Sequence, residues 1–303
     1  MHMSDALLSL PVAGAFWAVS GATLALSARR LDKDPDPARA PRMGVLAAFI
    51  FAAQLINFAL PGTGSSGHFA GGTLLALLLG PWAAFLAMAS VLCIQALFFA
   101  DGGLLALGAN LFNMGFIACF IAVPMVHAPL SLGRPSPARK RIAIMAASIT
   151  ACTLGAVSVC FQTSASGISQ LPFKHFALIM VPLHLLIGMV EGFISILVLE
   201  QLGAWKGEAK VQVGWGGKTL PALGLCTVLV AGVLSGYAST LPDGLEHSVQ
   251  KVQTAPLAAR TTAMPLLPEP RPGNTRSGLI GAGLVFAAAL GTGWAFRTRA
   301  QAH

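Results

Sequence analysis

The sequence predicts an all-α integral membrane protein, with a bundle of seven helices followed by two further transmembrane helices joined by an external loop. Of the 303 residues, 55% are hydrophobic and only 10% are charged, whereas soluble domains carry about 25% charged residues. The apolar residues form runs of about 20, the length that a helix needs to cross ~30 Å of hydrocarbon. These observations exclude a soluble enzyme, a disordered scaffold and a disulfide-stapled secreted domain.

The formal net charge of +8 is arranged as in a membrane protein. The basic residues fall mainly in short clusters between apolar runs, which is the pattern of membrane topology and not of a nucleic-acid-binding stripe. We therefore expect the lipid bilayer, and no nucleic acid, as a partner. All five cysteines lie inside apolar runs without a CxxC motif, which predicts buried small side chains.

Nine apolar runs are candidate membrane spans. Gly80-Pro81 divides the block 69–100, which is too long for one span, as a tight turn between two helices would. The piece 69–79 is short and follows a glycine-rich stretch that begins at Gly62. The expected spans are 8–28, 43–60, 69–79, 81–100, 104–126, 142–163, 176–203, 219–240 and 277–296.

The positive-inside rule orients these spans. An external N-terminus and a cytoplasmic C-terminus place most of the 19 Lys and Arg residues inside, provided that the short segment 69–79 also crosses. A polar stretch begins near residue 204 and predicts two parts, residues 1–203 with seven spans and residues 204–303 with two. We expect the external loop 241–276 to end as an extended, proline-rich linker, because Pro265, Pro268, Pro270 and Pro272 lie near its end.

The N-terminus carries the most specific chemistry. No basic residue precedes the first apolar run and no cleavage site follows it suitably, so we expect Met1 and His2 to remain in the mature protein. The Met1 amine, the His2 amide nitrogen and the His2 imidazole form adjoining five- and six-membered chelate rings on a metal ion. Three nitrogens then lie nearly in one plane, and square-planar nitrogen sites suit Ni(II) or Cu(II).

A fourth ligand is available in the glycine-rich stretch. His68 is expected on the same outer face as His2, and the neighbouring glycines allow the backbone to approach closely. The predicted metal ligands are therefore Met1, His2 and His68. Four polar residues are candidates for supporting the site or its loop, although Asp101 also suits an ordinary turn or helix cap: Asn57, Ser65, Ser66 and Asp101.

A second chemical possibility lies within the bundle. His184 and Glu191 are seven residues apart and share one helical face, as an intramembrane metal-dependent hydrolase would require. Two residues are fewer than the three protein ligands that a catalytic zinc ion usually has. An interior hydrogen-bonded pair is the simpler interpretation, and no catalytic residue or catalytic cofactor is predicted.

Several separated motifs resemble the NikM/CbiM family, the nickel/cobalt substrate-binding components of energy-coupling factor transporters. The start resembles the family's MHIxxGFL sequence, although Met3 and Ala6 replace the more common Ile and Gly, which affects how the terminus is positioned. The stretch after the eighth span resembles the PDGLE segment of NikN-like accessory components. The motifs, in order, are Met1–Ser9, Phe51–Phe58, Ser66–Gly72, Leu79–Ala83, Gln95–Gly103, Gly108–Gly115 and Pro242–Glu246.

This resemblance implies a nickel-binding subunit without its own ATPase, in the inner membrane of a prokaryotic cell. It implies a transmembrane coupling component of NikQ/CbiQ type and ATPase subunits of NikO/CbiO type as partners. It also implies that the terminal amine, the nitrogens of His2 and the imidazole of His68 hold the ion in a plane. Cobalt uptake is the nearest alternative. The hydrolase and a membrane subunit that only assembles partners are alternatives of other classes.

Overall fold

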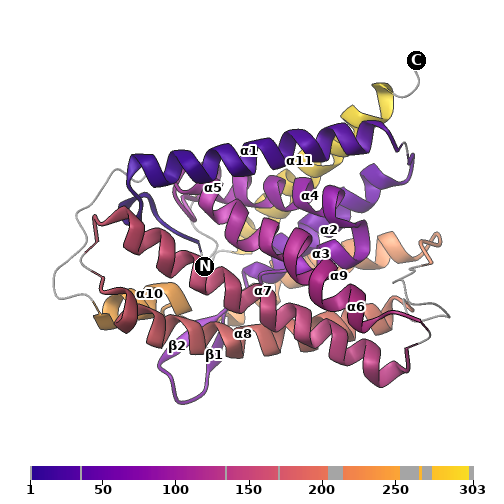
Figure 1. Ribbon diagram of the computed structural model, residues 1–303. Helices are drawn as coiled ribbons and strands as arrows, with labels where there is room; N and C mark the ends of the chain where they lie inside the picture. The colour runs from indigo at the N-terminus through magenta and orange to yellow at the C-terminus, as the bar shows by residue number, and fades with distance from the viewer. Residues whose placement is uncertain are drawn as a thin grey trace.

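The computed structural model describes residues 2–34, 36–133, 135–169, 171–203, 214–252, 266–267 and 275–299. Within them the chain is a helical bundle with one short antiparallel hairpin of strands β1 (Phe58–Leu60) and β2 (Ser65–Gly67) (Figure 1). The α-helices are α1 (Leu10–Asp32), α2 (Arg39–Gln54), α3 (Gly72–Leu79), α4 (Pro81–Ile94), α5 (Leu107–Asn110), α6 (Ala128–Leu130), α7 (Pro137–Ser166), α8 (Phe173–Gln201), α9 (Thr219–Gly232), α10 (Gly244–Val252) and α11 (Thr275–Arg299).

Seven helices of the described part are long and apolar enough to cross a membrane. Five lie before residue 204 and two after it, and a π-helical stretch joins α5 to α6 as one helix, Leu107–Leu130. Many of their large apolar side chains face outward, such as Phe161 at 62% and Leu178 at 70% exposure. Such surfaces are suited to lipid, so the all-α membrane class is confirmed.

The two remaining expected spans are shorter than a full crossing helix. Helix α2 has 16 residues, and α3 has eight, which rise only about 12 Å. Residues 65–71 precede α3 as a buried, non-helical chain, and Gly71 enters the helix with φ +80°. Segment 69–79 therefore begins as non-helical backbone and becomes helical only at Gly72. Non-helical backbone at membrane depth is tolerated where protein covers it.

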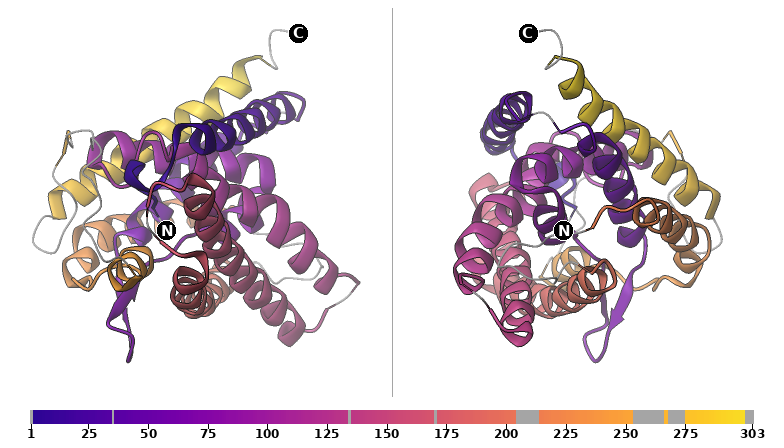
Figure 2. Two further views of the ribbon diagram at one scale, coloured as in Figure 1. Left: turned by 60° about the vertical axis from the view of Figure 1, so that its left-hand side comes forward. Right: turned by 90° about the vertical axis from the view of Figure 1, so that its right-hand side faces the viewer.

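The glycine and proline signals of the sequence produce the expected turns. Helix α3 ends at Leu79, Gly80 adopts φ +77°, and α4 begins at Pro81, where the missing N–H and fixed φ suit the first helical position. The hairpin turn contains Gly62 and Gly64, both with positive φ. In both views of Figure 2 this hairpin projects from the helical body.

Basic side chains mark the end of the bundle where α1 finishes and α2 begins, on the right in Figure 1. They contact aromatic rings or a carboxylate of neighbouring helix ends. The contacts are Arg30 over Trp82 at 5.6 Å, Arg42 over Trp215 at 5.3 Å and Arg141 to Glu200 at 2.7 Å. The site described below lies toward the opposite end.

The segment 241–276, which the sequence analysis expects outside the membrane, is not a loop throughout. Helix α10 occupies Gly244–Val252, and the Asp243 side chain caps it by accepting a hydrogen bond from the Glu246 N–H at 2.8 Å. The sequence analysis assigned no helix to this segment and did not use this cap signal. The proline-rich linker predicted for the end of the segment lies outside the described residues, as does the stretch 204–213.

Candidate metal centre

The amino-terminal segment is fixed inside the bundle by a side-chain amide. Asn110 Oδ1 accepts the Met3 N–H at 2.8 Å, and Asn110 Nδ2 donates to the Met3 carbonyl at 3.1 Å. The Gly103 N–H donates to the same carbonyl at 2.9 Å. Asp5 adds a hydrogen bond from the Ala106 N–H at 3.0 Å. The residue next to Met3 therefore has a defined position, whereas Met1 lies outside the described residues.

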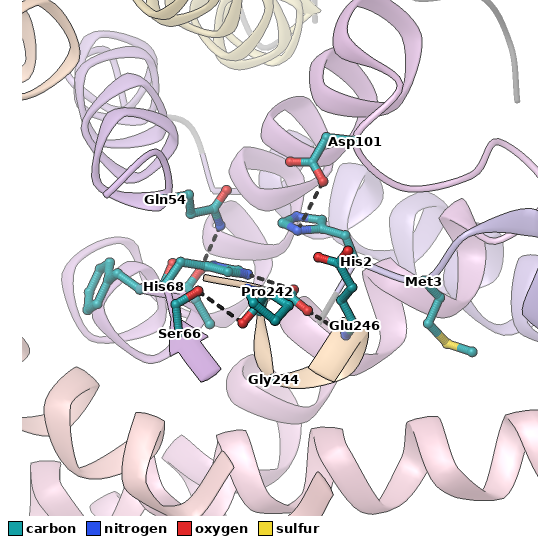
Figure 3. Close-up of polar contacts among 12 residues, drawn as sticks. His2, Met3, Gln54, Ser66, His68, Asp101, Pro242, Gly244 and Glu246 are labelled. Carbon is teal, nitrogen blue, oxygen red and sulfur yellow. Dashed lines mark hydrogen bonds and ion pairs between the residues drawn. The ribbon is translucent and has the colours of Figure 1, made fainter. Parts of the chain in front are cut away.

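Within this frame His2 and His68 come together, as the sequence suggested. Their rings stack with centroids 5.2 Å apart and planes at 17° (Figure 3). His68 follows β2 directly and is only 9% exposed, and the His2 side chain is 8% exposed. His2 Nε2 is buried. The His2 and His68 residues line one cavity.

Both imidazoles are kept neutral by their surroundings. Burial, followed by the positive charge of the amino terminus, lowers the pKa of His2 to about 3. Burial, the amino terminus and His2 lower the pKa of His68 to about 3 as well. Neutral imidazole is the form that binds metal ions, so both side chains are in a ligating state at neutral pH.

Two carboxylates face the imidazole pair. Asp101 Oδ1 lies 3.5 Å from His2 Nδ1, and Asp243 Oδ2 lies 3.9 Å from His68 Nε2. Both distances are longer than a typical N–H···O hydrogen bond. Burial opposes ionisation of Asp243, but the amino terminus, His68 and the α10 cap outweigh it, so its pKa lies below its usual range. Asp101 was a predicted supporting residue, whereas Asp243 was quoted only as part of a motif.

The supporting serines hold a segment from the far end of the chain. The Ser66 N–H donates to the Pro242 carbonyl and the Ser66 hydroxyl to the Leu241 carbonyl, both at 2.8 Å (Figure 3). The Ser65 hydroxyl reaches Pro242 at 3.3 Å. Asn57 participates through its main chain, because its carbonyl accepts the Ser239 N–H at 2.7 Å. Residues 239–243 thus form one wall of the site.

A cavity of about 510 Å³ lies between these groups. It opens among the imidazoles, both carboxylates and the docked segment, and it is the space that a small cation would occupy. Its lining residues are His2, Gln54, Leu55, Asn57, His68, Asp101, Ser239, Thr240, Leu241, Asp243 and Glu246.

Buried amides and a carboxylate hold the backbone that follows His68. Gln54 Nε2 donates to the Ala70 carbonyl at 2.9 Å, and Gln95 Nε2 donates to Gln54 Oε1 at 2.8 Å. Glu191 Oε2 accepts the Ala70 N–H at 3.1 Å and the Cys152 thiol at 3.4 Å. These hydrogen bonds satisfy both the backbone N–H and the backbone carbonyl of Ala70. The sequence signal for this role is a pair of amide side chains, Gln54 and Gln95, inside apolar runs.

His184 and Glu191 do not form the active site that the hydrolase alternative requires. His184 Nδ1 donates to the Met180 carbonyl at 2.8 Å, whereas Glu191 bonds to Ala70. Each residue therefore has its own structural partner. Among the described residues, no group of three His, Cys, Asp or Glu side chains is placed to hold a metal ion. The predicted centre differs in depending on terminal and amide nitrogens.

A multi-pass helical bundle with a buried imidazole pair beside two carboxylates defines a membrane protein whose cavity carries the types of side chain that metal ions bind. Sequence comparison then gives the family. The family described as "Cobalt uptake substrate-specific transmembrane region", CbiM, matches residues 2–209, and the PDGLE domain matches residues 217–266. The chain belongs to the CbiM family and is a nickel/cobalt transport membrane component of the fused NikMN type.

Individual relatives cover most of the chain. A putative fused nickel transport protein NikMN of Archaeoglobus fulgidus is 33% identical over 95% of this chain and 96% of its own. A cobalt transport protein CbiM of Sorangium cellulosum is 32% identical over 67% of this chain and 92% of its own. The solved structure of a truncated transition metal transporter aligns with TM-score 0.59 and 31% identity, over 67% of this chain and 98% of that one.

Proposed function

We propose that this protein is the substrate-binding membrane subunit of an energy-coupling factor importer for nickel ions. The observation that supports this most is the placement of His2 beside His68 in a cavity near one end of a membrane bundle. The Met1 amine and the amide and imidazole nitrogens of His2 chelate the ion, and His68 completes the plane. Asn57, Ser65, Ser66 and Asp101 support the site without serving as its nitrogen ligands.

The resemblance to energy-coupling factor transporters supports the choice of partners. A coupling component of NikQ/CbiQ type and ATPases of NikO/CbiO type supply the energy, and ATP hydrolysis reorients or opens the subunit toward the cytoplasm. The N-terminus and the cavity face outward, and the basic end faces the cytoplasm, in agreement with the positive-inside rule. The ion thus enters from outside and is released inside.

Nickel is favoured over cobalt by the names of the fused relatives. Those named fused nickel transport proteins include the NikMN of Rhodobacter capsulatus, at 36% identity over 52% of this chain. Planar nitrogen ligation also suits Ni(II). Cobalt is the second candidate, because relatives named cobalt transport protein CbiM match as well, one of them over 83% of this chain at 27% identity. Equilibrium dialysis with equal amounts of both ions decides between them.

The metal content of the purified full chain, together with sequencing of its N-terminus, tests this proposal. We expect about one nickel ion per chain and a start at Met1. His2→Ala and His68→Ala should each abolish retention, because each removes an imidazole from the site. His175→Ala, which changes an exposed histidine at the start of α8, should retain the ion. Retention by both site variants would contradict the ligand assignment.

The amine has its own test. One residue added before Met1, or acylation of the terminal amine, should be as damaging as loss of His2, because either change displaces or blocks a chelating nitrogen. Nickel retention by the extended and the unmodified chains gives the comparison. A hydrolase centred on His184 and Glu191 would be indifferent to this change.

A further inference from the structure

One carboxylate of the cavity comes from the second part of the chain and has its two oxygens in different environments. Asp243 Oδ1 is engaged as the cap of α10, where it accepts the Glu246 N–H at 2.8 Å. Asp243 Oδ2 is directed toward the site and lies 3.9 Å from His68 Nε2. The cap therefore fixes the side chain while one oxygen faces the cavity.

The main chain around Asp243 is fixed as firmly as its side chain. Ser66 pairs with the preceding residues through its N–H and its hydroxyl, both at 2.8 Å. On the other side, Gly244 packs on His184 so closely that a Cβ at Gly244 would lie 2.9 Å from His184 Cε1. The position of the carboxylate thus results from contacts on both of its flanks.

The space in front of Asp243 suits a hydrated cation. A divalent ion with about six waters occupies on the order of 200 Å³, and the cavity holds about 510 Å³. The imidazoles of His2 and His68 line the same cavity. The cavity therefore combines a hard oxygen ligand, which suits an ion that still carries water, with imidazole nitrogen that suits a dehydrated one.

We propose that Asp243 is the first protein ligand to receive the hydrated divalent cation, through Oδ2, before the nitrogen ligands displace its water. The second part of the chain thereby takes part in loading the metal site of the first. This step rests on the proposed function, because it presupposes that His2 and His68 form the final site. A carboxylate at the cavity wall raises the local concentration of cations and speeds their capture.

Asp243→Asn tests the role of the charge in the full-length protein. Asparagine keeps an oxygen for the α10 cap but removes the negative charge. The purified chain is stripped with a chelator and mixed with radioactive Ni²⁺, and both the initial rate of uptake and the final content are measured. We expect the initial rate to fall about tenfold, with unchanged final content. Added salt should slow the parent more than the variant.

Matched variants give the interpretation. Asp243→Glu keeps the charge and should restore a fast initial rate, and Glu200→Gln removes a charge at the opposite end of the bundle and should load like the parent. If Asp243→Asn gives too little folded protein, Asp243→Ser, which also retains a cap acceptor, takes its place. The thermal midpoint of each variant shows that it is folded.

The outcomes separate this step from the proposed function. An unchanged initial rate in Asp243→Asn would overturn the role of Asp243, while loss of retention in His68→Ala would still support the metal site. A final content as low as that of His68→Ala would also overturn it, since Asp243 would then be a permanent ligand. Full retention in both His2→Ala and His68→Ala would reject the site itself.

Discussion

Asn110 determines where the amino terminus lies. Its amide satisfies both the N–H and the carbonyl of Met3, at 2.8 and 3.1 Å, one residue away from His2. Asn110 and the Met3 side chain are buried, at 2% and 0% exposure. A flexible terminus would lose conformational entropy when it bound a metal ion. The Asn110 clamp removes much of this cost before the ion arrives.

Asn110→Ala should therefore weaken nickel binding without removing a ligand. The change leaves the buried Met3 N–H without its acceptor, at about 1–3 kcal/mol for a buried unpaired group, while the Met3 carbonyl keeps the Gly103 N–H. We therefore expect about a tenfold rise in the nickel Kd by equilibrium dialysis. Gln162→Ala is the control, because it breaks the buried Asn113–Gln162 pair without touching the Met3 backbone. Equal losses in both variants would mean that general destabilisation is responsible.

The depressed pKa values of His2 and His68 predict an acid-sensitive metal-free protein. Both are about 3 in the folded chain, and about 6.5 for unfolded histidine. The unfolded chain thus binds more protons between these values, so the stabilisation is complete above about pH 6.5 and is lost as pH falls toward 3. The thermal midpoint should be lower at about pH 5 than at about pH 7.5.

His2→Ala and His68→Ala test whether the two buried imidazoles cause this acid sensitivity. Each buried imidazole contributes up to about 1.4 kcal/mol per pH unit within that window, so each variant should show a smaller difference between the two midpoints. Thermal melts of the metal-free proteins in the same detergent give the comparison. The same pH sensitivity in the variants and the parent would assign the effect to other groups.

At the scale of elements, the segment between β2 and α3 is unusual because it is non-helical and buried. Residues 65–76 are all buried, and Gln54 and Glu191 satisfy the carbonyl and the N–H of Ala70. Non-helical backbone inside a membrane protein needs such partners, since no water is available to replace them. The polar residues of α2 and α8 thus allow His68 to lie deep in the bundle without a helix around it.

Gly72 permits the close approach that starts α3. A Cβ at this position would lie 2.3 Å from the Met114 carbonyl oxygen and 2.8 Å from Ala118 Cβ. Gly72→Ala should therefore separate α3 from its neighbouring helix and destabilise the protein by about 1–3 kcal/mol, as overpacking does, with a lower thermal midpoint. Gly14→Ala, in α1 with nothing within 4 Å of the new Cβ, should have no such effect.

At the scale of the molecule, the arrangement of basic residues predicts its orientation. Arg30, Arg42 and Arg141 contact helix ends on the side opposite the cavity, and such residues favour the cytoplasm. A fluorescent protein fused after His303 should therefore fluoresce in the cytoplasm, whereas one fused after Gly167, between α7 and α8, should be exported and stay dark. The reverse pattern of fluorescence would mean that the C-terminus lies outside, and it would contradict capture of the ion from the outside.

The sequence allowed the membrane class and the helix-turn positions to be predicted, because apolar run length and Gly80-Pro81 are local signals. The proximity of His2 and His68 followed from topology and chemistry. The non-helical course of residues 69–71 could not be predicted, since the hydrophobic pattern of a short apolar stretch does not distinguish a helix from another buried conformation. The facing of Asp243 toward His68 depends on residues about 175 positions apart, as in the Ser66–Leu241 hydrogen bond, which no local pattern records.

The walls of the cavity come from nearly the whole length of the chain, from His2 through Asp101 to Glu246. During synthesis the terminus emerges first, but the amide that clamps it follows about a hundred residues later, and the carboxylate of Asp243 comes later still. In the proposed role, a fragment that ends before Asn110 lacks the amide that holds the terminus, so we expect such a fragment to retain nickel poorly.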